Sequence, residues 1–438
     1  MTELMARGNE FYGDGLIRLD IPKNWKVSTL DMFGHRTPKL GQSDIEDVFE
    51  HPIGTQTIRE LAKGLDGRIV ITCDDLDRPT PAYEVVPTIL KQLKEAGVSD
   101  DKILFLGSFG CHHPMNRDDF ARKIGEEAVR SYDIANHNPF ENLVDLGRTS
   151  RGTPLEVNKE FSKADLRISI CGIKRHANGG AGGSGKSVLP GVSSIRAIDY
   201  NHTFIGKDSK LGQWRLKDND IRLDMQEAAR IAKLDFLVNC VVNDRRELCG
   251  LFTGDLDDSF VEAVKFAYKQ HSTPAPKDRT EIVIVNSYPQ GHHAIQGWDL
   301  ANDSLRDGGT VVNLHYHPIG SEIQHYHEER RRHLKRLAEY TEHPKRNVTV
   351  VEHTYSEGLF TAYYQGRPWP VENAGRTMMV SPSYSRRNVL DLSPRVEWYL
   401  NWEKAREELE KKHGEDASVT YYPCAALQFN PEARPLII

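Results

Sequence analysis

Apolar and polar positions alternate along the first half of the chain in blocks typical of a parallel α/β fold. The apolar run in GRIVITCDD (67–75) predicts a buried strand, and the amphipathic segment PAYEVVPTILKQLKEAG (81–97), which ends in glycine, predicts a helix. Strands and helices of the same kind are predicted at 102–110, 116–132, 165–173 and 224–243. Strands that alternate with helices in this way indicate a mainly parallel sheet with helices on its faces.

A short segment in the second half divides the chain. HSTPAPKDRT (271–280) contains two prolines and no apolar periodicity, which predicts a linker. The pattern restarts beyond it, with predicted strands at 281–289, 310–318 and 347–354 and predicted helices at 292–308, 321–342 and 394–414. We therefore predict two α/β domains with mainly parallel sheets flanked by helices, an N-terminal domain at 1–273 and a smaller C-terminal domain with a helical tail at 279–438.

Composition narrows the class of protein. The chain has 438 residues, 38% of them hydrophobic, and a formal net charge of -6, which suits an ordinary globular protein and gives no electrostatic footprint for nucleic acid or an anionic membrane. No apolar stretch approaches the roughly 18 residues that span a bilayer, and the start MTELMARGNEFYGDG is unlike a signal peptide. The six cysteines are scattered, which favours reduced thiols. We expect a cytoplasmic protein without nucleic-acid or membrane partners.

The segment GAGGSGKS at 180–187 matches the P-loop signature of proteins that bind nucleoside triphosphates. In a true P-loop a helix begins at the Gly-Lys-Ser sequence, whereas Pro190 follows closely here and would damage the first turns of such a helix. Five glycines between 179 and 185 still surround Lys186 beside a strand end, which suits a phosphate or a nucleotide. A P-loop-type nucleotide hydrolase or kinase is therefore an alternative, and a flexible surface loop is another.

Histidines lie near this loop and at another strand end. His112 falls in GCHHPM, His176 precedes the glycines and His202 follows them. The carboxyl ends of parallel strands meet at one edge of a sheet, so DDLDRPTP (74–81), GCHHPM and KRHANGGAGG should gather there. An isolated histidine is more often structural, but histidines grouped around a phosphate-type loop can bind a transition metal or act as general bases near neutral pH.

The order of these motifs resembles the lactate racemase family, whose members carry the nickel-pincer nucleotide, a sulfur-modified pyridinium mononucleotide that chelates nickel. The matching stretches are HPIGTQTIRELAKG, the D-x-x-R-P-x-P element at 75–81, GCHHPM, LGRTSRGTPLEVNKEFSKADLRISI, SVLPGVSSIRAIDYNH, NDRRELCGLFTGD and NSYP. The resemblance implies an isomerase that inverts carbon 2 of a 2-hydroxy acid by reversible hydride transfer to this cofactor. It also implies an active site in the interdomain cleft and partner proteins that make the cofactor and insert nickel.

The resemblance assigns a role to each matching position. Lys186 matches the lysine that can tether the cofactor covalently, and His202 matches the nickel ligand, with the two sulfurs and a ring carbon of the pincer as the other ligands. His112 and His176 match the paired acid/base histidines on opposite sides of the substrate carbon. Other implied residues are Asp75, Arg78, Gly182, Gly183, Ser184 and Gly185 at the cofactor, and Arg78, Tyr288, Gln296 and Asp299 at the substrate. We expect the glycines to give the mononucleotide room to approach the backbone.

Some positions depart from the family pattern. His113 replaces an arginine, Ile295 stands where tyrosine is often found, and Asp299 stands where lactate racemases place a substrate-facing lysine. An acidic residue repels a carboxylate but accepts hydrogen bonds from hydroxyl groups. We therefore expect a larger polyhydroxy acid, such as a sugar acid epimerised at carbon 2, in place of lactate.

A further histidine-rich segment, NLHYHPIGSEIQHYHEE, contains His315, His317, His325 and His327. These residues could contact substrate or a second metal, but a polar loop and a charged helix start can hold histidines without any function, and we favour that reading. Another alternative is a protein that keeps the fold to bind or mature the cofactor without catalysis. The presence of both acid/base histidines argues against it.

Overall fold

The computed structural model of the chain divides into two compact units. Unit 1 comprises Met1–His35 with His271–Ala433, and unit 2 comprises Arg36–Gln270 with Arg434–Ile438. The chain passes from unit 2 to unit 1 at residue 271, where the expected linker begins. Residues 1–35 belong to unit 1 and residues 434–438 to unit 2, whereas the sequence predicts each of these segments in the other domain. The described residues are 2–8, 15–112, 114–205, 210–290, 297–316, 371, 373–384 and 396–438.

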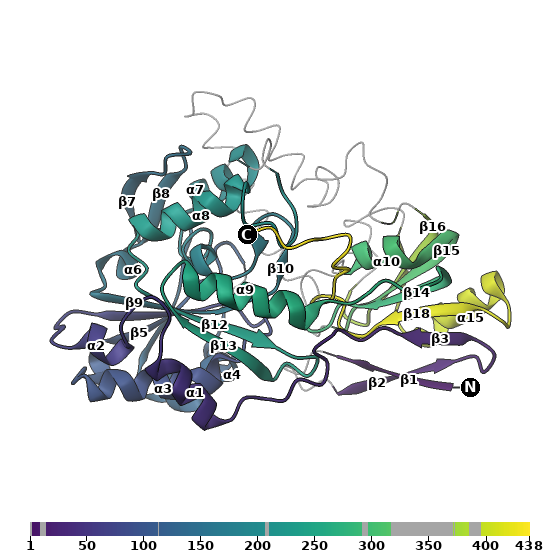
Figure 1. The fold of residues 1–438 in the computed structure, drawn as a ribbon, viewed down its shortest axis with the longest axis horizontal. Helices are drawn as coiled ribbons and strands as arrows, with labels where there is room; N and C mark the ends of the chain where they lie inside the picture. Colours follow the sequence, from purple (N-terminus) through teal and green to yellow (C-terminus); the bar gives the residue numbers. More distant parts are fainter. Residues whose placement is uncertain are drawn as a thin grey trace. The chain divides into compact units, whose positions relative to one another are not determined.

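Unit 2 is built on a six-stranded sheet in the order β13-β12-β9-β4-β5-β6 (Figure 1). Its neighbouring strands are parallel except for the antiparallel pair β12–β13. The central strands β4 and β5 are buried along their whole length, which explains their continuous apolar runs. The strands are β4 (Ile69–Cys73), β5 (Ile103–Gly107), β6 (Asp133–Asn136), β9 (Leu166–Gly172), β12 (Phe236–Val242) and β13 (Leu248–Gly254).

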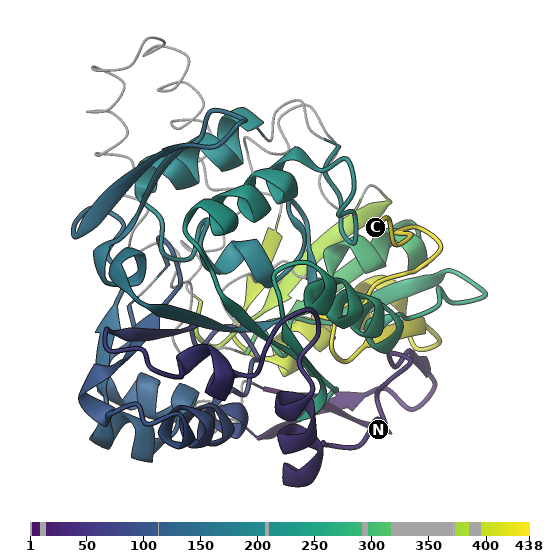
Figure 2. The ribbon, with the colours of Figure 1, turned by 60° about the vertical axis from the view of Figure 1, so that its left-hand side comes forward.

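Helices cover both faces of this sheet, as the strand-and-helix alternation predicts. Figures 1 and 2 show α1 and α3 on one face and α8 and α9 on the other. The helix predicted over 116–132 is divided in two at Gly125, whose φ of 96° is outside the helical region. The helices are α1 (Gln42–Glu50), α2 (Ile58–Ala62), α3 (Ala82–Glu95), α4 (Arg117–Ile124), α5 (Glu126–Ser131), α6 (Lys159–Lys163), α7 (Ile195–Asp199), α8 (Asp220–Ile231) and α9 (Asp258–His271).

Short antiparallel pairs complete unit 2 and carry part of the candidate site. One hairpin joins β7 to β8, and a smaller one joins β10 to β11 directly before the Gly-Lys-Ser sequence. Their bounds are β7 (Leu143–Arg148), β8 (Pro154–Asn158), β10 (Arg175–His176) and β11 (Gly180–Ala181).

Unit 1 contains a second six-stranded sheet, in the order β17-β16-β15-β14-β18-β3, and all of its neighbouring strands are parallel. The edge strand β3 comes from the N-terminus and pairs with β18, which explains why the first residues of the chain belong to this unit. The strands are β3 (Lys26–Thr29), β14 (Thr280–Asn286), β15 (Leu305–Leu314), β16 (Ala374–Val380), β17 (Val396–Tyr399) and β18 (Ser418–Tyr422).

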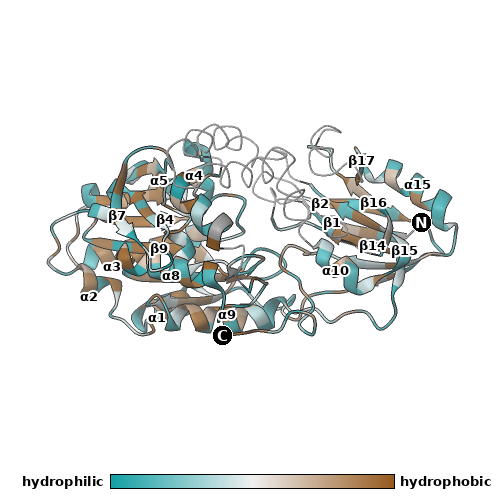
Figure 3. Ribbon diagram, turned by 90° about the horizontal axis from the view of Figure 1, so that it is seen from above, coloured by the Kyte–Doolittle hydropathy of each residue, from teal (hydrophilic) through white to brown (hydrophobic). Residues whose placement is uncertain are grey.

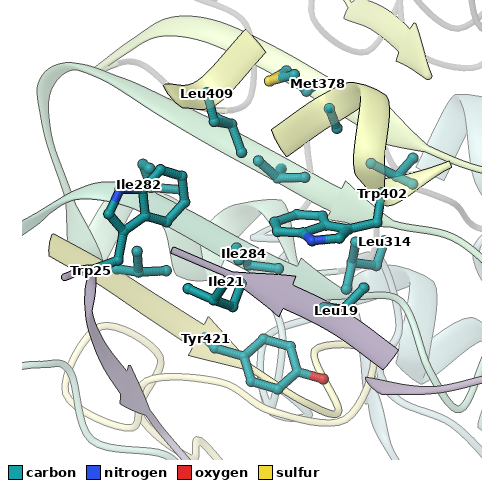
Figure 4. Packing of buried hydrophobic residues seen from close by; sticks show 14 of the residues in the cluster. Leu19, Ile21, Trp25, Ile282, Ile284, Leu314, Met378, Trp402, Leu409 and Tyr421 are labelled. Atoms are coloured by element: carbon teal, nitrogen blue, oxygen red, sulfur yellow. The ribbon is translucent and has the colours of Figure 1, made fainter. Parts of the chain in front are cut away.

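One face of this sheet packs against helix α15 (Trp402–His413) and the hairpin of β1 (Thr2–Arg7) and β2 (Leu16–Ile21). Figure 4 shows Trp25 and Trp402 beside apolar side chains of β14 and β2. Nε1 of Trp402 donates a hydrogen bond to the carbonyl of Asp20 at 2.9 Å. Helix α10 (Trp298–Ser304) packs on the other core cluster, in which Trp298 is 1% exposed.

The fold class predicted from the sequence is confirmed, since the two sheets are mainly parallel and carry flanking helices. Figure 3 shows apolar residues concentrated in the strands, whereas the helices carry both polar and apolar residues. The predicted helix at 321–342 and strand at 347–354 lie outside the described residues. No disulfide joins any of the six cysteines, and no helix in the described ranges is long and apolar enough to cross a membrane.

Candidate active site

Unit 2 brings the predicted chemical residues to the carboxyl edge of its parallel strands. Asp75 and Arg78 follow β4, and His112 lies in the loop after β5. The segment after β9 carries His176 and then the glycine-rich stretch. The sequence analysis expected these three segments to gather at the carboxyl edge of the sheet, and the structure places them there. This edge is the usual ligand-binding position of open parallel sheets.

His112 is paired with a buried carboxylate. Its Nδ1 lies 2.8 Å from Oδ2 of Asp75, whose side chain is 9% exposed. A carboxylate at neutral pH only accepts hydrogen bonds, so Nδ1 of His112 carries the proton and Nε2 carries the lone pair. Burial alone would raise the pKa of Asp75, but the hydrogen bond from His112 and the charge of Arg78 outweigh it and hold this pKa below its usual range.

A buried lysine of α4 holds the loop that carries Asp75. Nζ of Lys123, which has no exposed side-chain area, lies 2.5 Å from Oδ1 of Asp74. The same ammonium donates to the carbonyl oxygens of Asp75 at 2.9 Å and Arg78 at 3.2 Å. Our sequence reasoning missed Lys123. One feature of the sequence could have indicated that this lysine is buried: it shares a predicted amphipathic helix with apolar positions such as Phe120.

His176 has the opposite hydrogen-bonding arrangement. Its Nδ1 accepts the backbone N–H of Gly179 at 3.0 Å, so in the neutral ring the proton lies on Nε2. Burial is the main cause that holds the pKa of His176 well below its usual value, and the charges of Lys186 and Arg78 lower it further. The ring is therefore neutral at physiological pH.

His202 lies in a π-helical turn, Tyr200–Phe204, directly after α7. Its Nδ1 lies 3.1 Å from the carbonyl oxygen of Ile198, which can only accept, so Nδ1 carries the proton and Nε2 is the atom suited to a metal. The neighbouring Asn201 donates to buried Asp224 at 2.7 Å, which fixes the turn on α8. Among the described residues, no group of three or more His, Cys, Asp or Glu side chains is arranged to hold a metal ion.

The Gly-Lys-Ser sequence does not begin a helix of P-loop type. Ser184–Ser187 forms a single 3-10 turn, and the next helix, α7, begins only at Ile195. A P-loop places the phosphates at the N-terminus of a helix that starts at this sequence. The nucleotide hydrolase or kinase alternative therefore lacks the local structure that it requires.

Lys186 lies in this turn and has an unusual pKa. Burial lowers the pKa of Lys186 to about 7, and the positive charges of Arg78 and Arg222 contribute to the shift. A large fraction of the amine is therefore neutral near pH 7, and a neutral amine is a nucleophile. This property suits a lysine that forms a covalent bond to a ligand.

Side chains on one face of α8 donate hydrogen bonds to carbonyl oxygens of the glycine-rich segment. Nε of Arg222 donates to Gly179 O at 2.8 Å and Nη1 to Gly183 O at 3.1 Å, and Nη2 donates to Ala181 O. Asn219, three residues earlier, donates to Asn178 O at 2.7 Å. Residues three and four apart share one helix face, but only the fold shows that this polar face meets the glycines. Our sequence reasoning missed it.

Several donors that were assigned to the cofactor are hydrogen-bonded within the protein. Oε1 of Gln226 accepts the Gly185 N–H and the Ser184 hydroxyl, each at 2.9 Å. The Gly182 N–H donates to the carbonyl of Lys174 at 2.8 Å. These three groups stabilise the segment itself and do not point to a phosphate.

The glycines are required by packing on the protein. A Cβ at Gly183 would lie 2.4 Å from Cδ1 of Ile173, and a Cβ at Gly185 would lie 2.4 Å from the carbonyl oxygen of Met225. Packing alone therefore requires glycine at these two positions, and the expected approach of a mononucleotide stays a prediction. The segment is glycine-rich because it packs tightly between β9 and α8.

Several basic side chains are buried at the site, beside the carboxylates Asp75 and Asp77. Lys174 is 6% exposed, and its pKa is held well below the usual value by burial and by the charge of Arg78. Lys186 and Arg222 are buried in the same place, and burial lowers the pKa of each. Buried cations are stabilised by an anionic partner, so the donor set suits a ligand that carries a phosphate or a carboxylate.

The residues that the sequence predicts at the substrate, other than Arg78, fall in the second half of the chain. Tyr288 follows β14 and is 5% exposed, and Asp299 lies half-buried in the first turn of α10. His315 is 1% exposed, and its Nδ1 lies 3.2 Å from the hydroxyl of Ser381, which supports a structural role. Gln296, His113, Ile295, His317, His325 and His327 lie outside the described residues.

The fold and the site define an α/β protein in which histidines and a lysine of low pKa meet at the carboxyl edge of a parallel sheet. Residues 12–212 match the family model of the lactate racemase N-terminal domain. The chain belongs to the lactate racemase family.

Similar proteins and structures agree with this family. The chain is 32% identical over 278 residues to the lactate racemase of Lactiplantibacillus plantarum, covering 62% of this chain and 65% of that protein. It is 26% identical over 310 residues to the lactate racemase of Thermoanaerobacterium thermosaccharolyticum, covering 69% and 72%. The alignments thus span about two thirds of the relatives' lengths. Both relatives are named as racemases, which are isomerases.

Solved structures share the fold. The apoprotein of the Thermoanaerobacterium thermosaccharolyticum lactate racemase superposes with a TM-score of 0.68 at 21% identity, covering 98% of this chain and 99% of that one. A protein from Thermotoga maritima superposes with a TM-score of 0.62 at 17% identity, covering 88% and 97%.

Proposed function

We propose that this protein is a racemase or epimerase that inverts carbon 2 of a 2-hydroxy acid. The observation that carries the proposal is the hydrogen bond between Asp75 and Nδ1 of His112, which sets Nε2 as the proton acceptor. Oxidation at carbon 2 requires removal of the hydroxyl proton, and His112 is suited to take it. The carboxylate of Asp75 stabilises the imidazolium that then forms.

The residues of the site fit the nickel-pincer nucleotide of the family. His202 has the tautomer of a metal ligand, with Nδ1 directed at Ile198 O. Lys186, with a pKa of about 7, is suited to form the covalent tether. The cofactor would accept and return the hydride, which no side chain can do. Proteins that make the cofactor and insert nickel are then required partners.

Other residues bind and orient the substrate. Arg78 has 17% of its side chain exposed, and a guanidinium can hold a carboxylate through two parallel hydrogen bonds. Lys123 and Asp74 position the loop that presents Arg78 and Asp75. We assign His176 as the second acid/base residue.

We propose a polyhydroxy acid as the substrate in place of lactate. The support is the carboxylate of Asp299 at a position where lactate racemases carry a lysine, because a carboxylate accepts hydrogen bonds from additional hydroxyl groups. A sugar acid epimerised at carbon 2 has this chemistry.

The test uses protein coexpressed with the cofactor-making enzymes. Isomerisation of lactate and of a panel of aldonic acids is measured by chiral chromatography, together with nickel content and intact mass. We expect turnover of an aldonic acid and little turnover of lactate. His202→Ala should abolish nickel retention, whereas His112→Ala should retain nickel and lose turnover. Robust lactate racemisation would overturn the substrate assignment, and protein without nickel or isomerase activity would overturn the proposed function.

A further inference from the structure

The β7–β8 hairpin is bound to helix α8 through acidic side chains of the helix. The carboxylate of Glu227 accepts the backbone N–H and the hydroxyl of Ser150, each at 2.6 Å. Nε of Arg151 donates to Oδ1 of Asp220 at 3.2 Å. Residues three and four apart are neighbours on the surface of a helix, so Asp224 lies on the same face as these two acidic residues.

Asp224 differs from its two neighbours because it is fully buried and accepts hydrogen bonds from three uncharged donors. The hydroxyl of Thr149 donates to Oδ1 at 2.5 Å, and the hydroxyl of Thr153 donates to Oδ2 at 2.7 Å. Nδ2 of Asn201 donates to the same Oδ2 at 2.7 Å. Asp224, Thr153 and Asn201 have no exposed area. Burial of a charge without a cationic partner is costly, so packing alone does not explain a carboxylate at this position.

The three donors come from two segments that are far apart in the sequence. Thr149 and Thr153 lie at the turn of the β7–β8 hairpin, whereas Asn201 lies in the π-helical turn and directly precedes His202. Asp224 therefore joins the hairpin to the turn that carries the proposed nickel ligand. None of the residues assigned to the site in the proposed function lies on this hairpin.

A second contact joins the same two segments. Gly152 in the hairpin has a φ of 91°, and a Cβ at this position would lie 2.8 Å from the hydroxyl oxygen of Tyr200, the first residue of the π-helical turn. This conformation and this close approach both favour glycine. The π-helical turn is thus held at its first two residues, Tyr200 by packing on the hairpin and Asn201 by its bond to Asp224.

We propose that Asp224 is a positioning residue for the metal site, and that it acts through Asn201 to fix the direction in which His202 presents Nε2. This inference rests on the proposed function, in which His202 binds nickel. Consecutive residues project to different sides of a helical turn, so an anchored Asn201 side chain fixes the rotation of the turn about its axis. The bond of 3.1 Å from Nδ1 of His202 to Ile198 O then orients the ring.

Helix α8 consequently supports two parts of the site. Arg222 donates to carbonyl oxygens of the glycine-rich segment that precedes Lys186, and Asp224 holds the turn that contains His202. The cofactor in the proposed function needs both residues, Lys186 as the covalent tether and His202 as the metal ligand. A single helix therefore fixes the tether and the ligand relative to each other.

The first experiment measures the π-helical turn in the apoprotein. Hydrogen–deuterium exchange of the peptide 198–205 is compared between the wild type, Asp224→Ala and Asn201→Ala. We expect exchange to be roughly tenfold faster in both variants, on the order of one lost hydrogen bond to a charged group. Asn201→Ala keeps the two threonine donors of Asp224, so it tests the link even if the Asp224 variant does not fold. Exchange at the wild-type rate in Asn201→Ala would overturn the proposal.

Glu227→Ala is the matched control, because Glu227 lies on the same helix face and binds the same hairpin but does not contact Asn201. Exchange of the peptide 198–205 in this variant should stay at the wild-type rate. Exchange as fast as in Asp224→Ala would mean that any loosening of the hairpin loosens the turn, which would overturn a specific role for Asp224.

The second experiment measures the rate at which the loaded enzyme loses nickel to a chelator. We expect Asp224→Ala and Asn201→Ala each to release nickel about tenfold faster or more, in the range for residues that orient metal ligands. The double variant should release nickel no faster than Asp224→Ala alone, because both changes break the same link. We also expect a lower kcat with little change in KM, since the substrate-binding residues are untouched.

Additive effects in the double variant, or nickel release at the rate of Glu227→Ala, would overturn the proposal. Wild-type protein that retains no nickel would defeat the proposed function, whereas exchange in the apoprotein decides independently whether Asp224 fixes the turn.

Discussion

Nζ of Lys123 and Oδ1 of Asp74 form a buried ion pair 2.5 Å long beneath the loop that carries Asp75 and Arg78. The lysine is fully buried and Asp74 is 18% exposed, so removal of either charge leaves the other poorly solvated. The pair therefore determines the position of the residues that face the substrate in the proposed function.

Lys123→Met should destabilise the protein by about 3–5 kcal/mol, the range found when one partner of a buried ion pair is removed. Urea unfolding monitored by circular dichroism measures the change. The double variant Lys123→Met/Asp74→Asn should recover part of the loss, because the uncompensated carboxylate is gone. A single variant as stable as the wild type would show that the pair is not required for folding.

Asp75→Asn should lower kcat by roughly 10²–10⁴-fold while leaving the fold intact, because His112 loses the charge that stabilises its imidazolium. Isomerisation rates with the loaded enzyme measure the effect, and nickel content should stay at the wild-type level because His202 is unchanged. Asp77→Asn, a change of the nearby carboxylate that lies 3.7 Å from Arg78, is the matched control and should have a smaller effect on kcat. Equal losses in the two variants would argue against a specific role for Asp75.

Lys186→Met should stabilise the apoprotein near neutral pH. The pKa of Lys186 is about 7 in the folded protein, against about 10.4 in an unfolded chain. The unfolded chain therefore binds the proton more tightly, and the resulting destabilisation is complete below pH 7 and fades as the pH rises towards 10.4. We expect a gain of about 2–4 kcal/mol at pH 7 that shrinks by about 1.4 kcal/mol or less for each pH unit above it.

Thermal unfolding of the Lys186 variants between pH 7 and pH 9.5 measures this gain. Lys186→Arg is the control, because arginine stays protonated over the whole range and should give no gain at pH 7. A gain for Lys186→Met that does not change with pH would mean that packing, and not the charge, is responsible. Loss of the covalent mass increment in the same variant would support the tethering role.

Arg222→Lys should weaken retention of the cofactor and destabilise the protein by roughly 2 kcal/mol, because a lysine cannot reach three carbonyl oxygens in a fixed fork. Nickel content after gel filtration and urea unfolding are the measurements. Arg230→Lys on the same helix is the control, since Arg230 is 54% exposed and bound to Asp257 at the surface. Similar behaviour of the two variants would contradict a specific role of Arg222 in holding the glycine-rich segment.

The sequence predicts the strands of unit 2 and the loops that carry its chemistry, because apolar periodicity and the geometry of a parallel sheet are local and general properties. It places His112, His176 and Lys186 at one sheet edge by this rule alone. Hydrogen bonds between distant segments are beyond such reasoning. The contacts of Arg222 with the glycines, and of Lys123 with the loop after β4, depend on helix rotation and packing that no spacing encodes.

The glycine-rich motif alone does not reveal which physical requirement its glycines meet. The pattern GAGGSGKS has the composition of a phosphate loop, yet a Cβ at Gly185 would meet the backbone of Met225 and the Gly185 N–H is bound by Gln226. The same residue types therefore satisfy two different physical requirements, close packing on a helix or close approach of a ligand. Only the position of the neighbouring helix distinguishes them.

The pairing of β3 with β18 has a consequence for synthesis on the ribosome. Thr29 pairs with Tyr421 at the far end of the chain, so the N-terminal strand emerges long before its partner exists. At about 5–20 residues per second, the delay between them is roughly 20–80 seconds. Unit 2 can complete most of its sheet during this time. The N-terminal strand β3 has no pairing partner until β18 has been synthesised. Newly made chains should therefore depend on chaperones that shield the first residues until the last strand arrives.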